Sequence, residues 1–252
     1  MDLGLQGRVA LTTGASGGIG AAIARALAAE GARVAAGYHS RRDAAERLAA
    51  DCERAGGSAL VVPHDLRNPD SIRAAVDTIV RTWGRLDILV TSAWVHPEWP
   101  DRPGGDPSSP EMWQEQLGVN AEGTACTVQA VLPHMKAGGW GRIVLISSGA
   151  AEDGQPGLEA YAAGKAALHG FARSLARGLG GDGILVNVVM PGFIPTERIR
   201  RLVPVAVLEQ WASMTPIGRL ATEEEVARVV VFMASAANGS TTGAAVRVSG
   251  GL

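Results

Sequence analysis

The stretch that decides the fold is Arg8-Val-Ala-Leu-Thr-Thr-Gly-Ala-Ser-Gly-Gly-Ile-Gly20, where an apolar strand pattern runs directly into a glycine-rich turn. An apolar helix pattern, Ala21–Glu30, follows without interruption. A strand, a glycine turn and a helix N-terminus together point backbone N–H groups and the helix dipole at one place, where a pyrophosphate can approach. The stretch therefore predicts the first βαβ unit of a dinucleotide-binding fold.

Strand-like and helical patterns alternate along the rest of the chain. Strands are expected at Arg33–Ala36, Ala59–Val62, Leu86–Val90, Arg142–Ser147, Ile184–Val189 and Ala245–Val248, and helices at Asp43–Ala55, Pro69–Trp83, Pro110–Lys136, Ala160–Leu179 and Glu223–Ala236. Continuous apolar strands separated by helices predict an α/β fold, a doubly wound parallel sheet of Rossmann type with helices on both faces. The 252 residues suit one catalytic domain, 1–252. Irregular segments near 94–110 and 193–216 follow strand ends, so we expect them to shape a substrate site.

Composition argues against several other classes of protein. A formal net charge of −2 gives no reason to expect nucleic acid or an anionic membrane as partner. Cys52 and Cys126 have no metal-ligand spacing, and the five histidines have none either, so we expect reduced thiols and no metal site. The chain begins without a signal-peptide pattern, and its longest apolar run is too short to span a bilayer. We expect a cytoplasmic protein.

The motif Tyr161-Ala-Ala-Gly-Lys165 sets a phenol and an ammonium four residues apart. On a helix this spacing places both side chains on one face. A free tyrosine ionises near pH ~10, and a cation nearby lowers its pKa towards the range useful to a general acid or base. The alternative interpretation is a solvated helix face that carries both residues. The chain has only two tyrosines and two lysines, which favours a chemical role.

Together, Thr13-Gly-x-x-x-Gly-Ile-Gly20 and Tyr161-x-x-x-Lys165 resemble the short-chain dehydrogenase/reductase family, close to its 3-oxoacyl-(acyl carrier protein) reductase branch. The resemblance covers nearly the whole chain. It implies that Tyr161 is the general acid, that Lys165 lowers its pKa and holds the nicotinamide ribose, and that Ser148 donates to the substrate oxygen. It also implies that Asn120 holds a water that relays protons. The cofactor residues that it implies are Gly14, Ser16, Gly18, Ile19, Gly20, Asp65, Lys165, Pro191, Gly192, Ile194 and Thr196.

The end of the second strand selects the nicotinamide cofactor. A carboxylate there would bind the ribose diol and repel a 2′-phosphate. The chain instead has Tyr38 in that position, followed by Ser40, Arg41 and Arg42, which offer a hydroxyl and two guanidinium groups to a phosphate. One family cue for NADPH is missing, because Gly17 stands where many NADPH users carry Arg or Lys. We expect NADPH/NADP in preference to NAD.

One departure from the family is large. After the fourth strand the family usually continues Asn-Asn-Ala-Gly, and this chain has Thr91-Ser-Ala-Trp94. Glycine permits close backbone approach to the cofactor ribose, so an indole there must turn away from the cofactor or roof the substrate pocket. We expect Trp94 and His96 to face the substrate, which would be a specialised, flat or polyketide-like carbonyl compound.

The leading hypothesis is an NADPH-dependent carbonyl reductase acting on a small or carrier-bound substrate. The alternatives are a quinone or imine reductase, a non-catalytic dinucleotide sensor, and a structural subunit that binds no cofactor. The helices expected at Pro110–Lys136 and Ala160–Leu179 carry small apolar residues on more than one face. The resemblance implies that they pair across two-fold axes in a homotetramer.

Overall fold

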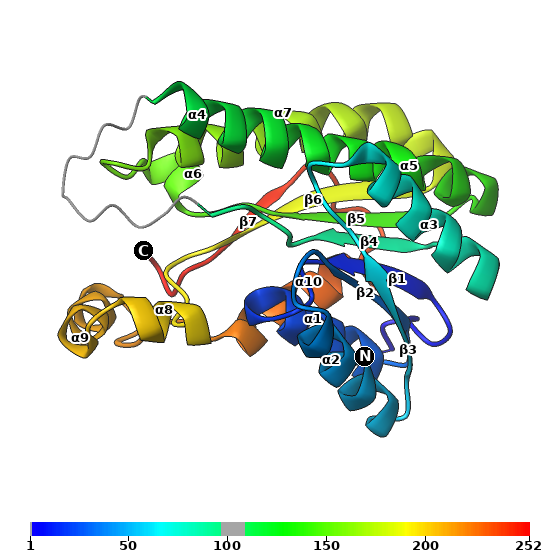
Figure 1. The fold of residues 1–252 in the computed structure, drawn as a ribbon, viewed down its shortest axis with the longest axis horizontal. Helices are drawn as coiled ribbons and strands as arrows, with labels where there is room; N and C mark the ends of the chain where they lie inside the picture. The colour runs from blue at the N-terminus through cyan, green and yellow to red at the C-terminus, as the bar shows by residue number, and fades with distance from the viewer. Residues whose placement is uncertain (1, 97–108) are drawn as a thin grey trace.

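A parallel sheet of seven strands, in the order β3-β2-β1-β4-β5-β6-β7, forms the centre of the computed structural model, which describes residues 2–96 and 109–252 (Figure 1). The strands are β1 (Val9–Thr13), β2 (Arg33–Tyr38), β3 (Ser58–Pro63), β4 (Ile88–Thr91), β5 (Gly141–Ile146), β6 (Ile184–Pro191) and β7 (Ala245–Val248). Every neighbouring pair of strands is parallel. The predicted doubly wound parallel sheet is confirmed. The strand order reverses between β1 and β4, where open α/β sheets bind ligands.

Helices cover both faces of the sheet. On one face lie α1 (Gly18–Ala29), α2 (Arg42–Arg54) and α10 (Glu223–Met233), and on the other α3 (Pro69–Trp83), α5 (Glu122–Gly138) and α7 (Glu159–Leu179) (Figure 1). Each layer buries its own apolar cluster, built largely from Ala, Val, Leu and Ile. Among residues 2–96 and 109–252, no helix is long and apolar enough to cross a membrane.

The helix expected at Pro110–Lys136 is three consecutive segments. It begins with α4 (Pro110–Trp113), continues as the π-helix η1 (Gln114–Ala121) and ends as α5. An apolar pattern does not distinguish α- from π-helical turns, so η1 could not be predicted from it. Most of the substrate loop expected near 94–110 lies outside the described residues.

The segment near 193–216, which we expected to be irregular, contains two helices. These are α8 (Glu197–Leu202) and α9 (Val205–Met214). The side chain of Thr196 caps α8 by accepting a hydrogen bond from the backbone N–H of Ile199. Both helices are short, so neither gives the long periodic apolar pattern that indicates a helix in a sequence. A further short helix, α6 (Ala150–Asp153), follows β5, and a 3-10 turn, η2 (Gly180–Asp182), follows α7.

A charged cluster holds the amino ends of the central strands together. Asp87, directly before β4, accepts hydrogen bonds from the backbone N–H of Val9 at 2.9 Å and from the guanidinium groups of Arg8 and Arg85. The buried Arg142 of β5 donates to the carbonyls of Ser235 and Asn238 at 3.1 and 3.0 Å. This charged cluster lies at the opposite ends of the strands from the glycine-rich turn.

Candidate active site

The glycine-rich turn between β1 and α1 packs directly against the segment that follows β4. Gly14 has a φ of +65°, and a Cβ there would lie 2.8 Å from the Cα of Ala93. A Cβ on Gly20 would lie 2.5 Å from the carbonyl oxygen of Gly14. The Ala93 N–H donates to Thr13 Oγ1 at 3.0 Å and ties the two segments together. The turn therefore has room for a ligand only on its outer side, where the N-terminus of α1 points.

Arg41 covers the outer side of this turn. A Cβ on Gly17 would lie 3.0 Å from Nη2 of Arg41, so the guanidinium occupies the space that a side chain at position 17 would fill. The missing NADPH cue at position 17 is thus replaced by a cation that comes from the N-terminus of α2. Arg42 instead pairs with Glu46 on its own helix at 2.8 Å. The side chain of Tyr38 is buried at the end of β2.

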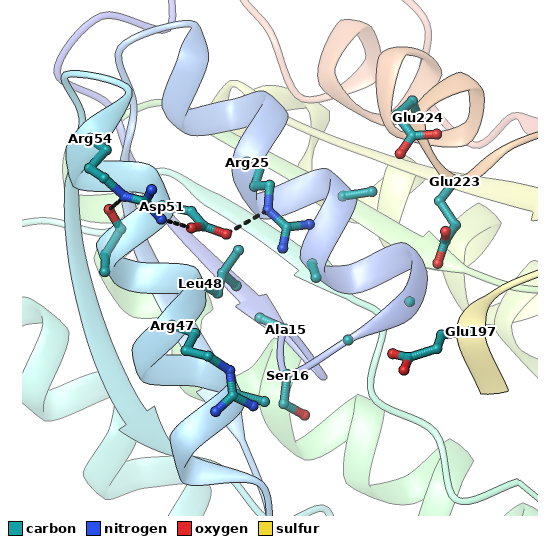
Figure 2. Close-up of a pocket in the computed structure, with 16 residues that line it drawn as sticks. Ala15, Ser16, Arg25, Arg47, Leu48, Asp51, Arg54, Glu197, Glu223 and Glu224 are labelled. Atoms are coloured by element: carbon teal, nitrogen blue, oxygen red, sulfur yellow. Dashed lines mark hydrogen bonds and ion pairs between the residues drawn. The ribbon is translucent and has the colours of Figure 1, made fainter.

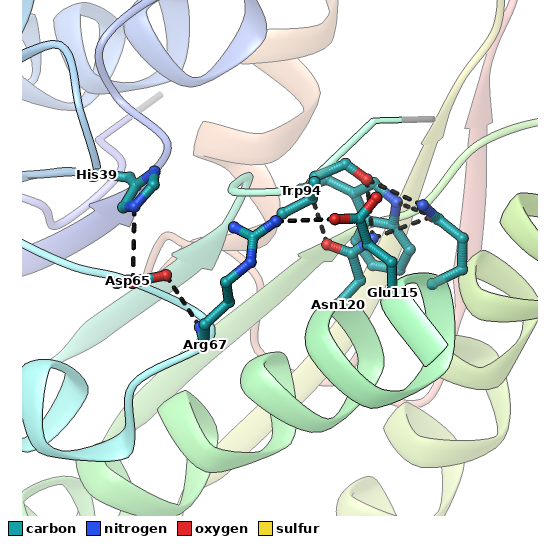
Figure 3. Close-up of polar contacts among 8 residues, drawn as sticks. His39, Asp65, Arg67, Trp94, Glu115 and Asn120 are labelled. Carbon is teal, nitrogen blue, oxygen red and sulfur yellow. Dashed lines mark hydrogen bonds and ion pairs between the residues drawn. The ribbon is translucent and has the colours of Figure 1, made fainter. Parts of the chain in front are cut away.

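Residues after β2 and β3 meet at the expected adenine end of the site. His39 Nε2 lies 3.6 Å from a carboxylate oxygen of Asp65. Figure 3 marks this contact with a dashed line. Asp65 also accepts a hydrogen bond from the backbone N–H of Arg67 at 3.0 Å. The Arg67 guanidinium in turn reaches Glu115 of η1 at 2.8 Å. This chain of contacts runs from β2 to the π-helix.

A cavity of about 510 Å³ lies on the α1 and α2 side of the glycine-rich turn (Figure 2). Ser16 and Gly18 line its edge, and Arg25 on α1 pairs with Asp51 on α2 at 3.2 Å. Glu197, Glu223 and Glu224 line the opposite wall. Its lining includes none of the four expected catalytic residues. This cavity therefore shares the turn with the candidate active site but is separate from its catalytic end.

The expected catalytic residues lie at the carboxyl end of β5 and on α7. Ser148 follows β5, and Tyr161 and Lys165 lie one turn apart near the beginning of α7. Burial raises the pKa of Tyr161, and a hydrogen bond with Ser148 opposes that rise. The Lys165 side chain is only 4% exposed, and burial holds the pKa of its ammonium well below the ordinary value. The Lys165 Nζ donates to the carbonyl oxygen of Ile146 at 2.9 Å.

The structure does not give the lowered Tyr161 pKa that we expected from the nearby Lys165 ammonium. We expected the ammonium to lower the pKa of the phenol, whereas burial of Tyr161 raises it. The Lys165 Nζ lies 5.9 Å from the centre of the Tyr161 ring and is bonded to Ile146 instead. Spacing on a helix places both residues on one face, but it does not decide where a long side chain ends.

Asn120 is buried in η1 and its amide is fully engaged (Figure 3). Its Oδ1 accepts from the N–H of Val95 at 2.7 Å, and its Nδ2 donates to the Val95 carbonyl at 2.9 Å. Nδ2 also lies 3.0 Å from Oε1 of Gln116, one turn earlier on η1. The side chain thus ties the segment after β4 to the π-helix. The water relay through Asn120 stays a prediction.

Trp94 turns towards α7 and η1. Its Nε1 donates to Gln116 Oε1 at 2.8 Å, and the centre of its ring system lies 3.6 Å from Lys165 Nζ. Its ring lies at 85° to the Tyr161 ring, with centroids 6.2 Å apart. The His96 ring stacks beside Tyr161 at 6.3 Å. Both residues thus lie next to the expected general acid, and their contact with a substrate stays a prediction.

The last expected group follows β6. Pro191 ends that strand, Gly192 packs against Ser249, and Ile194 is buried in the core. Thr196 lies beside the glycine-rich turn, since a Cβ on Gly18 would be 3.6 Å from its methyl group. The structure therefore brings the segment after β6 to the same end of the sheet as the turn.

One residue of the site, Gln116, was missed by the sequence analysis. Gln116 is completely buried and joins Trp94, Val95 and Asn120. Its only sequence signal is a position one helical turn before Asn120. Ser147, beside Ser148, donates to the carbonyl of Lys165 at 3.1 Å and meets His169 at 2.9 Å. It holds the backbone of α7 in place.

Comparison with known proteins identifies the family. The family model described as enoyl-(acyl carrier protein) reductase matches residues 14–252. The chain is 38% identical to the short-chain reductase protein NovJ of Streptomyces niveus over 98% of this chain and 94% of that protein. It is 39% identical to the 3-oxoacyl-[acyl-carrier-protein] reductase FabG of Pseudomonas aeruginosa, over 99% of each.

A solved structure agrees with these relatives. It is a 3-oxoacyl (acyl-carrier-protein) reductase from Agrobacterium tumefaciens C58 with NADP bound, and it superposes with a TM-score of 0.90 at 32% identity, over 100% of this chain and 96% of that one. The chain belongs to the short-chain dehydrogenase/reductase family and is an oxidoreductase.

Proposed function

We propose that the protein reduces a carbonyl group to an alcohol with NADPH, and that Tyr161 is the general acid. The observation that carries the proposal is the meeting of Ser148, Tyr161 and Lys165 at one end of the sheet, beside the glycine-rich turn. Relatives named as 3-oxoacyl-[acyl-carrier-protein] reductase and acetoacetyl-CoA reductase support this reaction class. Their names also support a carrier-bound or thioester substrate.

The residues present fit a phosphorylated dinucleotide. The turn from Gly14 to Gly20 would hold the pyrophosphate, because its backbone leaves room only on the side of the α1 N-terminus. Arg41, Ser40 and Tyr38 would hold the 2′-phosphate, and Asp65 would meet the adenine. Lys165 and the segment from Pro191 to Thr196 would hold the nicotinamide half. When bound, NADPH supplies the hydride that the carbonyl carbon accepts.

The protein's own part in the reaction is to deliver a proton and bind the oxygen. The Ser148 and Tyr161 hydroxyls donate hydrogen bonds to the substrate oxygen. As negative charge develops there, Tyr161 gives up its proton to form the alcohol. The raised pKa of Tyr161 keeps the phenol protonated at neutral pH until that charge appears. The proton returns to Tyr161 from solvent along a path that we assign to Lys165 and Asn120.

Aromatic side chains favour a flat substrate. Trp94 and His96 flank Tyr161, and Phe193 stacks on Trp211 of α9 with centroids 5.4 Å apart. Planar rings gain from stacking on such surfaces, so we propose a flat or polyketide-like carbonyl compound. A quinone or imine reductase is the second candidate, since a quinone is also flat.

The test is a turnover panel with purified protein. NADPH oxidation would be followed with acyl thioesters, cyclic and aromatic ketones, quinones and cyclic imines. Turnover confined to ketones or thioesters supports the proposal, and turnover confined to quinones or imines supports the second candidate. NADPH binding without any turnover would favour a dinucleotide sensor. No binding at all would favour a structural subunit.

A further inference from the structure

Trp94 stands where the family usually has glycine, and three of its contacts fix the position of its indole. Nε1 donates to Gln116 Oε1 at 2.8 Å. A Cβ on Gly164 would lie 3.2 Å from Cζ2, so the absence of a side chain at position 164 makes room for the ring. The ring also packs against the apolar cluster on the α3, α5 and α7 side of the sheet. The indole is therefore held between η1 and α7.

The face of this indole covers Lys165. An ammonium has three N–H groups, and taking it out of water is costly unless they find partners. The carbonyl oxygen of Ile146 accepts one N–H at 2.9 Å, and the indole centroid lies 3.6 Å from Nζ. A tryptophan face at this distance attracts a cation, most strongly where water is excluded. Within residues 2–96 and 109–252, the titratable groups that face Lys165 are Tyr161 and His96.

We propose that Trp94, anchored by Gln116, is a positioning residue for Lys165, and that it holds the ammonium against Ile146 and keeps it charged. A glycine at position 94 would leave one side of the buried ammonium without this support. The indole face therefore gives the Lys165 ammonium part of the stabilisation that water gives to an exposed ammonium. This role of Trp94 deepens the proposed function. Only the NADPH titration described below rests on that function, and the lysine measurements do not.

The chain offers a direct probe, because Lys136 and Lys165 are its only lysines. Protein labelled with ¹³C and ¹⁵N at lysine should give two sets of side-chain signals. Lys136, half exposed and paired with Asp182 at 3.0 Å, serves as the internal reference. The ε-CH₂ protons of Lys165 should be shifted upfield by the indole ring current in the cofactor-free protein. Equal ε-CH₂ shifts for both lysines would overturn the proposal.

Substitutions of Trp94 and Gln116 distinguish the effect of the indole ring from the effect of the hydrogen bond that anchors it. Trp94→Leu should abolish the upfield shift and increase the acid ionisation constant of Lys165 about tenfold, as expected for losing a desolvated cation–π contact. Trp94→Phe and Gln116→Met should each give a smaller change, because one keeps a ring and the other keeps the indole without its anchor. The matched control is Trp83→Leu, which removes another indole packed against the same cluster. A Lys136 signal that does not move shows that each variant is folded.

NADPH titration by calorimetry completes the test. Trp94→Leu should weaken NADPH binding about tenfold and Trp83→Leu should leave it unchanged. Tighter binding by Trp94→Leu would overturn the proposal, because the indole would then compete with the cofactor for Lys165. An unchanged ionisation constant in Trp94→Leu would also overturn it. If the wild-type protein binds no NADPH, the proposed function fails, whereas the lysine signals still decide the role of Trp94.

Discussion

Arg41 and Arg42 are adjacent in the sequence but should contribute very differently to cofactor choice. The Arg41 guanidinium lies over Gly17 of the glycine-rich turn, while Arg42 pairs with Glu46 on its own helix. We therefore expect Arg41→Ala to weaken the use of NADPH and to leave the use of NADH nearly unchanged. Arg42→Ala, which removes the same charge one residue away, is the matched control.

The magnitude follows from one lost contact between a guanidinium and a phosphate. A hydrogen bond to a charged group contributes about 1.5–3 kcal/mol, which corresponds to roughly tenfold to hundredfold in the Michaelis constant for NADPH. Arg42→Ala should change that constant by less than about threefold, because Arg42 has to leave Glu46 before it can reach the turn. Arg41→Lys should recover part of the loss, since a lysine keeps the charge without the planar fork.

The assay is steady-state turnover of one substrate with NADPH and with NADH, for the wild-type protein and the three variants. Direct binding of each cofactor by calorimetry shows whether the effect is on affinity. If Arg41→Ala changes the constants for NADPH and NADH equally, Arg41 does not contact the 2′-phosphate. A larger effect from Arg42→Ala than from Arg41→Ala would mean that the two side chains exchange places when the cofactor binds.

Three other predictions are independent of the choice of cofactor. Tyr161→Phe should lose at least about a hundredfold of turnover while NADPH binding and melting temperature are kept, since only the proton donor is removed; retained turnover would contradict the mechanism. We expect sedimentation at micromolar concentration to give a homotetramer, and a stable monomer would refute this. Burial lowers the pKa of His64 to about 4, so the neutral form is favoured in the folded protein and stability should fall as the pH decreases from about 6.5 to about 4. His64 should account for roughly 3 kcal/mol of this loss, measured as the difference between the wild-type protein and a folded His64→Gln variant in denaturant unfolding across that pH range.

The apolar patterns of the strands and of the longer helices predicted most of the fold. Every expected strand is present to within two residues at each end, since a buried parallel strand leaves a continuous apolar run. Pro69–Trp83 was predicted with its observed bounds because Asn68 and Gly84 are strong capping residues. The short helices α8 and α9 carry no comparable period, and the capping by Thr196 became visible only in the structure.

The sequence predicted only those features of the candidate site that follow from the spacing of residues along one helix or strand. Tyr161 and Lys165 lie on one face of α7, as their separation requires. The position of the Lys165 ammonium, however, depends on Ile146 of β5 and on Trp94 in the segment after β4. Likewise, the guanidinium over Gly17 comes from Arg41, which follows a different strand. Contacts between distant segments determine pKa values and charge positions, and a single sequence does not contain them.

The charged cluster around Asp87 and Arg142 has a consequence for adapting this protein to heat. Arg142 is the second residue of β5, so about 16 Å of strand separates it from Ser147, which follows Ile146. Substitutions in the cluster should therefore alter the rate of thermal inactivation while the surviving molecules keep their substrate preference. A programme of directed evolution can treat the two ends of the sheet as separate libraries, one screened for half-life at raised temperature and the other for selectivity. Gains from the two libraries should combine, because sites so far apart act nearly additively.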